Sequence, residues 1–496
     1  MPRATARLQE LPRNPKNSNK LNYGKGTFLT KPLGVYGWEK LEAILLAAIV
    51  SKTPLLLIGP HGCAKSYLLE RLAVALNLEY RFYNASLINY DDLVGIPIPS
   101  EDKKSLEYIA TPTSIWEAEV VFVDEINRSK PELQNKIFPI IHEKRVQGIN
   151  LDKLHFRWAA MNPVSSEEKE DEVYLGAQQL DKALADRFGF IVEIPAWKDL
   201  SRKDKMAVLA GVPDGEPLFP HPIEEMIDLC QNRLNRLQNQ ENALIKNYLL
   251  ILGDKLAHAG IRLSTRRITM LYANILAVRA AMETLQILCS SPIEPSWFDV
   301  ARRTLINSIP QRAEDAALDS FQLDAAHMQA WALAENNFEN SKDQDLLLIS
   351  CPMERLLTAM RRAKSTSQKT LSATIIDFIC DSTSILEQGA RTLAFYVATQ
   401  QHLTAPIEAL DAMSDILSKI LTPSSEIIAV KNKDRDEINE LNKPVRPDCS
   451  KEGRMLNIYE KNLEQWVYKK NHSATECVNT RIYFRKMYRK IYKAIA

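Results

Sequence analysis

Short apolar runs alternate with helical patterns between residues 37 and 196. The run TPLLLIG at residues 53–59 is almost entirely apolar, as in a strand that is buried on both faces of a parallel sheet. Four similar runs follow, in YRFYNAS, VVFVDE, FRWAAMNP and GFIVEIP, and helical stretches such as SYLLERLAVAL separate them. This alternation predicts an α/β domain with a mainly parallel sheet.

The rest of the chain has a different pattern. From residue 197 to about residue 425 the strand pattern nearly disappears and helical periodicity replaces it. Residues 423–455 are polar and contain prolines, which indicates a linker or an exposed loop. Beyond them, nine basic residues lie between Lys461 and Ala496, interleaved with six aromatic rings.

Composition narrows the class of protein. The chain has 496 residues, a formal net charge of +1, 45% hydrophobic residues and 25% charged residues, which is typical of a water-soluble globular protein of several domains. Residues 1–31 carry seven basic residues against Glu10 alone, and predict a flexible basic arm. Neither a membrane span nor a secretory signal is visible, so we expect a cytoplasmic protein. The seven cysteines are scattered without a CxxC pair, which argues against a disulfide framework or a zinc site.

The stretch GPHGCAKS at residues 59–66 lies between a strand pattern and a helical pattern, which is the context of a phosphate-binding loop. Small residues let successive backbone N–H groups surround the phosphates of ATP, and the next helix points its N-terminus at them. Lys65 would reach the terminal phosphates, and Ser66 would offer its hydroxyl to Mg²⁺. The predicted nucleotide-binding residues are Gly59, Pro60, His61, Gly62, Cys63, Ala64, Lys65, Ser66, Tyr67 and Asp124.

Ala64 stands where the usual pattern of this loop has glycine. A Cβ atom penalises a positive φ angle, so the alanine predicts that the backbone does not need a positive φ at this position.

Two acids, Asp124 and Glu125, end the apolar strand VVFVDE. Carboxylates at the end of a buried strand are costly to desolvate unless something there needs them. Asp124 would hold Mg²⁺, mostly through water, and Glu125 would polarise the water that attacks the γ-phosphate. Asn162, at the end of WAAMNP, would orient that water or contact the γ-phosphate, and the alternative is that it caps the next turn.

A family resemblance extends across roughly residues 31–310. The stretches GPHGCAKS, DDLVGIPIP, VVFVDEINRSKPELQNKIFPIIHEKRVQG, AAMNP, LDKALADRFGFIVEIP and LSTRR resemble, in this order, the MoxR-like branch of the AAA+ ATPases, which includes the CbbQ, NorQ and RavA groups and is related to dynein-like AAA domains. The resemblance implies an AAA+ αβα core at residues 32–196 and a helical lid at 197–313. A helical region of unknown role would occupy 314–425, with a linker and the basic aromatic segment at 426–496.

The resemblance also implies roles for two loops and for several arginines. The stretches 90–113 and 142–146 would face the pore or the substrate surface of a ring, unless they are ordinary surface loops. Arg187 matches the arginine that enters the adjacent subunit's site and neutralises charge on the γ-phosphate. Arg128 is a second candidate at the subunit boundary. Arg266 matches the sensor 2 arginine, which would contact its own subunit's nucleotide, with Arg262 and Arg267 as alternatives.

Three functions compete at this point. The resemblance favours a chaperone-like ATPase, a homo-oligomer and by resemblance a hexameric ring, that remodels a protein client such as a von Willebrand factor A domain protein. The alternative is a nucleic-acid motor or defence component related to McrB-like GTPases, with the basic C-terminal segment holding nucleic acid. Tyrosine and tryptophan at helical spacing, however, more often pack on a neighbouring helix. A scaffold that binds ATP without hydrolysing it would not need Glu125, Asn162 and Arg187 together.

Overall fold

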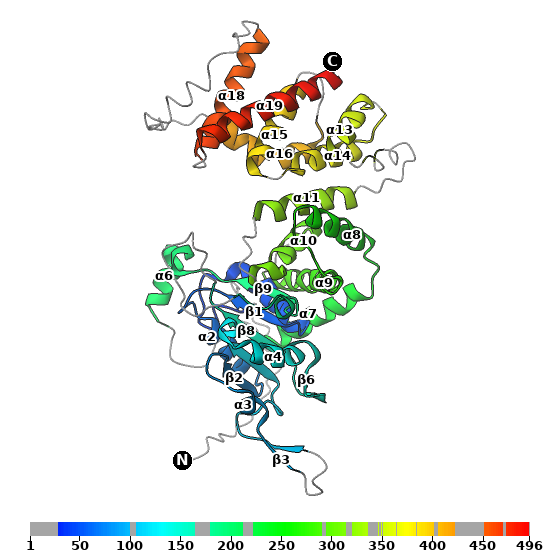
Figure 1. Ribbon diagram of the computed structural model, residues 1–496. Helices are drawn as coiled ribbons and strands as arrows, with labels where there is room; N and C mark the ends of the chain where they lie inside the picture. Colours follow the sequence, from blue (N-terminus) through cyan, green and yellow to red (C-terminus); the bar gives the residue numbers. More distant parts are fainter. Residues whose placement is uncertain are drawn as a thin grey trace.

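The computed structural model describes residues 28–99, 106–163, 179–211, 222–289, 294–313, 320–335, 346, 349, 351–363, 365–382, 384–400, 405–421, 451–469 and 473–495. The sheet lies toward one end of the molecule, and helices α13 to α19 lie at the opposite end (Figure 1). Among the helices of these residues, none has the length and apolar character needed to cross a bilayer.

Five parallel strands form the main sheet, in the order β2-β5-β8-β1-β9. They are β1 (Leu55–Ile58), β2 (Tyr80–Asn84), β5 (Val120–Asp124), β8 (Phe156–Met161) and β9 (Phe190–Glu193), and each coincides with one of the predicted apolar runs. The prediction of a mainly parallel α/β sheet is confirmed. Because the strands are parallel, their carboxyl ends lie at one edge, where β5 and β8 deliver Asp124 and Asn162.

Helices cover both faces of this sheet. Side chains alternate between the two faces along each strand, so Leu55 and Leu57 pack with α1 (Glu42–Val50) and α2 (Lys65–Ala75), whereas Leu56 and Ile58 belong to a second core. That second core includes residues of α3 (Tyr90–Val94), α4 (Pro131–Glu143) and α5 (Lys182–Ala185). Burial on both faces explains why the central strands β1, β5 and β8 are almost continuously apolar.

Two antiparallel hairpins interrupt the α/β order. One consists of β3 (Ile96–Pro99) and β4 (Leu106–Ile109), within the insertion expected at residues 90–113, and it projects from the sheet end of the molecule (Figure 1). The other consists of β6 (Arg145–Val146) and β7 (Ile149–Asn150), directly after α4, and its first strand overlaps the stretch 142–146. The hydroxyl of Tyr108 donates to the Gln147 side chain and joins the two hairpins.

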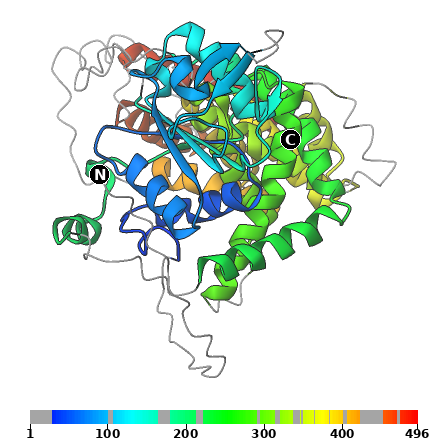
Figure 2. The ribbon, with the colours of Figure 1, turned by 90° about the horizontal axis from the view of Figure 1, so that it is seen from below.

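Helices follow the sheet as predicted. They comprise η3 (Trp197–Asp199), α6 (Arg202–Leu209), α7 (Ile223–Gln238), α8 (Ala243–His258), α9 (Thr265–Leu288), α10 (Trp297–Ile306) and η4 (Pro310–Ala313). Helix α9 packs against α1, α7 and α10, and so joins the helical part to the sheet domain. Seen from below, most of the green helices lie along one side of the blue and cyan sheet domain (Figure 2).

The C-terminal helices build a separate core. They are α13 (Pro352–Arg361), α14 (Gln368–Cys380), α15 (Ile385–Thr399), α16 (Ile407–Leu421), α18 (Lys451–Lys469) and α19 (Ala474–Ile495). The helical pattern over residues 373–400 is divided into α14 and α15, because Ser384 caps a new helix by accepting from the Glu387 N–H. Helix α11 (Ser320–Glu335) belongs to both cores, since Leu323 and Ala330 pack with the first and Ala325 with the second.

A buried acid joins the two helical parts. Asp377 of α14 is fully buried and pairs with Lys255 of α8 at 2.6 Å and with Arg355 of α13. Both cations come from neighbouring helices, so the charge is compensated where water cannot reach it.

The described end of the basic arm is ordered. The backbone N–H groups of Phe28, Leu29 and Thr30 donate to the carboxylate of Glu42 in α1 at 2.8–3.1 Å, and all three residues are buried. Residues 28–31 therefore differ from the flexible arm expected over residues 1–31, because a buried carboxylate on α1 binds their backbone. The remainder of that arm lies outside the described residues.

Candidate functional site

A cavity of about 260 Å³ opens at the carboxyl ends of the central strands. Its walls are formed by the loop after β1, the start of α2, and the ends of β5 and β8. The lining residues are His61, Gly62, Cys63, Ala64, Lys65, Ser66, Tyr67, Asp124, Glu125 and Asn162. All ten were predicted from the sequence as site residues, and the fold brings them together in one place.

Glycine is needed at Gly59 and at Gly62 for two different physical reasons. A Cβ atom on Gly59 would lie 2.2 Å from Cγ1 of Ile194, so glycine allows the strand end to pack closely on the segment after β9. Gly62 has φ +73°, a left-handed conformation that glycine adopts without a steric penalty. Both features shape the turn that leads into α2.

Ala64 contradicts the expectation of a negative φ. Its backbone lies in the left-handed region, with φ 64° and ψ 23°, directly before the first residue of α2. The loop therefore keeps the geometry for which glycine is usual, and the alanine carries the strain of its Cβ, a cost of roughly 1–2 kcal/mol.

Lys65 lies at the centre of the cavity. Its ammonium donates to the carbonyl oxygens of Gly59 at 2.6 Å and Pro60 at 2.8 Å, and to Oδ1 of Asn162 at 3.3 Å. Burial lowers the pKa of Lys65, and the negative charges of Asp124 and Glu125 oppose that shift. The ammonium thus occupies a largely desolvated position in which an anionic phosphate would be a stronger partner than neutral carbonyls.

Ser66 and Asp124, the two residues expected to hold Mg²⁺, are in direct contact. The Ser66 hydroxyl donates to Oδ2 of Asp124 at 2.7 Å, and the other carboxylate oxygen accepts from the Glu125 N–H at 2.9 Å. A hydroxyl and a carboxylate oxygen in contact, beside a phosphate-binding loop, are ligands of the kind that Mg²⁺ prefers. The residues therefore fit a magnesium nucleotide.

The carboxylate of Glu125 is held by Arg128 and by two residues that were not predicted from the sequence, Asn84 and Ser86. Its Oε2 accepts from Ser86 Oγ at 3.2 Å and from Asn84 Nδ2 at 3.4 Å, and Oε1 pairs with Arg128 at 3.6 Å. Asn84 ends β2 and pairs in register with Asp124. Since strand order cannot be read from the sequence, only the polar end of YRFYNAS could have indicated these residues. Arg128, which was expected at a subunit boundary, forms an ion pair with Glu125 of its own chain.

Asn162 has its side chain in the cavity. Its Oδ1 accepts from Lys65, and its Nδ2 lies 3.3 Å from Nε2 of His61. The Asn127 side chain donates to its backbone carbonyl at 3.2 Å. These contacts point the amide toward the predicted phosphate site, so the capping alternative finds no support in them.

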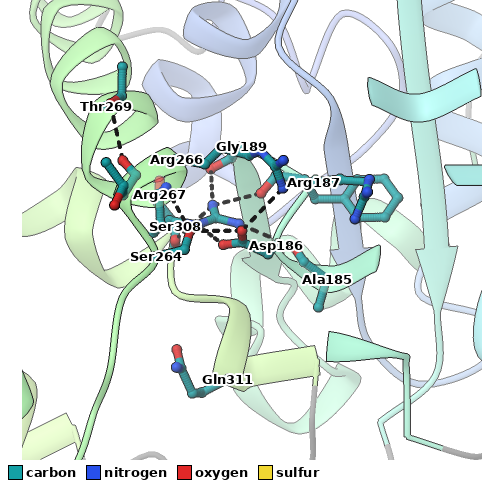
Figure 3. A network of polar contacts seen from close by, with 12 residues as sticks. Ala185, Asp186, Arg187, Gly189, Ser264, Arg266, Arg267, Thr269, Ser308 and Gln311 are labelled. Carbon is teal, nitrogen blue, oxygen red and sulfur yellow. Dashed lines mark hydrogen bonds and ion pairs between the residues drawn. The ribbon is translucent and has the colours of Figure 1, made fainter. Parts of the chain in front are cut away.

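Arg187 and Arg266 are not among the residues that line the cavity. Arg187 follows α5, where its guanidinium lies 4.7 Å from the ring centroid of Phe138. Arg266 pairs at 3.6 Å with Asp186, the residue next to Arg187, so the two arginines belong to one cluster (Figure 3). His142 lies close enough to both arginines for their charges to affect it. Burial is the largest cause of its lowered pKa, and the charges of Arg266 and Arg187 lower the pKa further.

Arg266 was expected at the nucleotide of its own subunit, and its side chain does not line that cavity in this structure. The start of α9 packs at the beginning of β9, away from the cavity residues, and therefore groups Arg266 with Arg187. Arg267, one of the alternatives, is fully buried and donates to carbonyl oxygens of Ala185, Phe188, Gly189 and Ser308. These hydrogen bonds explain why an arginine occupies the first turn of α9, and they could not be predicted from the sequence.

Comparison with known proteins gives one family match and one similar solved structure. Residues 54–188 match the family of AAA domains of the dynein-related subfamily. The fold is also similar to a crystal structure described as that of a "putative ATPase" from Cytophaga hutchinsonii ATCC 33406, with a TM-score of 0.41 and 21% identity, over 57% of this chain and 84% of that chain. The matched residues contain the phosphate-binding loop, both acids, Asn162 and Arg187. Residues 54–188 therefore resemble AAA domains of the dynein-related subfamily.

Proposed function

We propose that this chain is a Mg²⁺-dependent ATPase of the MoxR-like type that works as an oligomeric ring on a protein client. One observation carries the proposal: Lys65, the Ser66–Asp124 pair and Glu125 converge in a single cavity within an AAA domain. Phosphoryl transfer needs a cation at the phosphates, ligands for a metal and a group that orients water, and these residues meet all three needs.

Each residue has a part in the proposed reaction. Ser66 and Asp124 would hold Mg²⁺, which would neutralise charge on the phosphates of ATP. Lys65 exchanges its carbonyl partners for phosphate oxygens, and Asn162 orients the water or the γ-phosphate from the opposite wall. Glu125 polarises the water once its carboxylate is released from Ser86 and Asn84.

The proposal requires more than one subunit. Arg187 and Arg266 lie outside their own chain's cavity, and we propose that both reach the γ-phosphate of a neighbouring subunit. A guanidinium that enters such a site in trans is worth about 10³-fold or more in rate. The lid boundary at residue 313, the hexameric number and the chaperone-like role remain proposals that rest on the family resemblance.

The described C-terminal helices favour a protein client over nucleic acid. Phe484 and Tyr488 of α19 are buried in the C-terminal core, and the Tyr483 hydroxyl accepts from Arg391 at 2.7 Å. The Arg485 guanidinium forms two hydrogen bonds with Glu460 of α18, at 2.5 and 2.7 Å. Rings and cations that are used for helix packing cannot serve as a stacking platform for bases.

The decisive experiment measures nucleotide binding and hydrolysis by the purified chain. We expect tight binding of ATP with Mg²⁺, slow basal turnover and stimulation by a protein partner, with a von Willebrand factor A domain protein as the first candidate. Lys65→Ala should abolish binding, and Glu125→Gln should bind ATP without hydrolysing it. Absence of affinity for any nucleoside triphosphate would refute the proposal, and stimulation by DNA alone, lost at higher salt, would favour the nucleic-acid alternative.

A further inference from the structure

Arg267 joins the start of α9 to the segment that carries Arg187. Its side chain is 0% exposed. The guanidinium donates to the carbonyl oxygens of Phe188 at 2.7 Å, Ser308 at 3.1 Å, Ala185 at 3.2 Å and Gly189 at 3.3 Å (Figure 3). Its Nε also pairs with Asp186 at 3.3 Å.

The acceptors flank Arg187 on both sides. Residues 185 and 186 precede it and residues 188 and 189 follow it, so the guanidinium holds the backbone immediately before and after the arginine. Asn274, also on α9, donates to the Gly189 carbonyl at 2.9 Å. A planar guanidinium with several donors fixes such a set of acceptors far better than the point charge of a lysine does.

Asp186 connects Arg266 to the same unit. Its carboxylate accepts from the Ser264 hydroxyl at 2.8 Å and from Arg267, and it pairs with Arg266 at 3.6 Å. Ser264 is itself the N-cap of α9, because its hydroxyl accepts from the Arg267 N–H at 3.0 Å. The cap, the acid and the buried arginine therefore form one network between α9 and the α5–β9 connection.

The position of Arg267 has a cost that its partners must offset. A cation in the first turn of a helix opposes the helix dipole, and a guanidinium without water needs partners for its donors. The hydrogen bonds also satisfy the carbonyl oxygens, because a buried carbonyl oxygen without a donor destabilises the fold. Such a network holds its members in one geometry, since a displacement of either element would break several hydrogen bonds at once.

We propose that Arg267 and Asp186 are positioning residues that fix Arg187 and Arg266 as one unit relative to α9, so that a subunit presents both arginines to its neighbour together. The inference rests on the proposed function, in which these arginines complete the neighbour's site. It goes further by coupling that contribution to the orientation of the helical part. A helix rotation in one subunit then moves both arginines at the adjacent nucleotide.

A mixing experiment separates the two roles of a subunit. Glu125→Gln subunits supply arginines without hydrolysing ATP, and Arg187→Ala subunits hydrolyse ATP only with a neighbour's arginine. Adding Arg267→Lys to the Glu125→Gln supplier should reduce the restored turnover roughly tenfold or more, because displacements of about 1 Å cost that much. Adding Arg267→Lys to the Arg187→Ala recipient should leave the rescue unchanged, since its own cavity is intact.

Two further variants guard against a general folding defect. Arg279→Lys is the matched control, because Arg279 is also a buried arginine of α9 but pairs with Glu283 and Glu294, and it should leave the supplier active. Asp186→Asn in the supplier should reproduce the loss caused by Arg267→Lys. An equal loss when Arg267→Lys is placed in the supplier or in the recipient would reduce its role to folding, and no loss in the supplier would refute the inference.

Hydrogen exchange tests the inference without any turnover. The amides of Arg187, Phe188 and Ile191 donate to backbone carbonyls around this segment. Arg267→Lys should raise their exchange rates above those of Arg279→Lys, and unchanged rates would overturn the positioning role. If unmodified Glu125→Gln subunits fail to rescue Arg187→Ala while exchange still rises, the trans arrangement fails and the positioning role stands.

Discussion

The Ser86 hydroxyl lies 3.2 Å from the Glu125 carboxylate and 2.6 Å from Oδ1 of Asn84, so its proton is shared between the two acceptors at the ends of the paired strands β2 and β5. The bond to Glu125, together with that from Asn84, occupies lone pairs of the carboxylate that we expect to polarise water. In the geometry described, Glu125 is held by its own chain before any water is activated.

Removing the Ser86 hydroxyl should therefore raise basal ATP turnover. A hydrogen bond of this kind is worth roughly 0.5–1.5 kcal/mol, so we expect Ser86→Ala to increase turnover about 2- to 10-fold with unchanged ATP affinity. Steady-state hydrolysis and equilibrium ATP binding provide the measurement. Ser129→Ala is a suitable control, because its hydroxyl donates to the Ile126 carbonyl and not to Glu125. A fall in turnover with Ser86→Ala would mean that the bond positions Glu125 for catalysis.

The left-handed backbone of Ala64 predicts a stabilising substitution. Replacing Ala64 by glycine removes the Cβ that is strained at φ 64°, and this gain exceeds the extra entropy of the unfolded chain, for a net effect of about 1 kcal/mol. Chemical denaturation of the nucleotide-free protein measures the free energy of unfolding. The control is Ala75→Gly in the last turn of α2, where the backbone is helical and glycine should destabilise by up to about 1 kcal/mol. A loss of stability with Ala64→Gly would contradict the strain.

Buried His327 should make the free energy of unfolding depend on pH. Its Nδ1 lies 2.8 Å from the Tyr248 hydroxyl, and burial, with a smaller effect of the Arg302 charge, lowers its pKa to about 3. The unfolded chain takes up a proton near pH 6.5 and the folded chain does not, so stability is lost as the pH falls from about 6.5 toward 3.

The expected loss attributable to His327 at pH 5.5 is roughly 1.4 kcal/mol relative to high pH. Burial also lowers the pKa values of His142 and His155, so the comparison must isolate one histidine. His327→Gln should unfold with a shallower dependence on pH than the unmodified chain between pH 7.5 and 5.5. Parallel pH profiles for the two proteins would show that His327 is accessible to protons in the folded state.

The residues themselves explain why parts of the fold and site could be predicted. The central strands β1, β5 and β8 were visible because both of their faces are buried and they are therefore continuously apolar, and GPHGCAKS was visible because its chemistry is contiguous in the chain. Asn84 and Ser86 were missed because their role depends on β2 lying beside β5, which is a property of the sheet.

The arginines at the start of α9 show a second reason why parts of the site could not be predicted from the sequence. Arg266 and Arg267 are neighbours in the sequence and differ in direction by about 100° around the helix. One ends up 42% exposed in its side chain and the other fully buried, and only the packing of α9 on the sheet domain decides which is which. The strain at Ala64 is a limit of the same kind, because the loop geometry dominates the preference of the residue.

Cys63 offers a direct chemical test of where nucleotide binds. The cysteine lies between Gly62 and Ala64, is partly exposed and lines the cavity. ATP in that cavity would cover the thiol, so ATP with Mg²⁺ should slow alkylation of Cys63 by iodoacetamide severalfold. Cys289 and Cys351 are exposed on other helices or their ends and supply internal controls whose rates should not change. Peptide mapping by mass spectrometry reads all three in one sample, and Lys65→Ala should remove the protection. Equal alkylation of Cys63 with and without saturating nucleotide would place the binding site elsewhere.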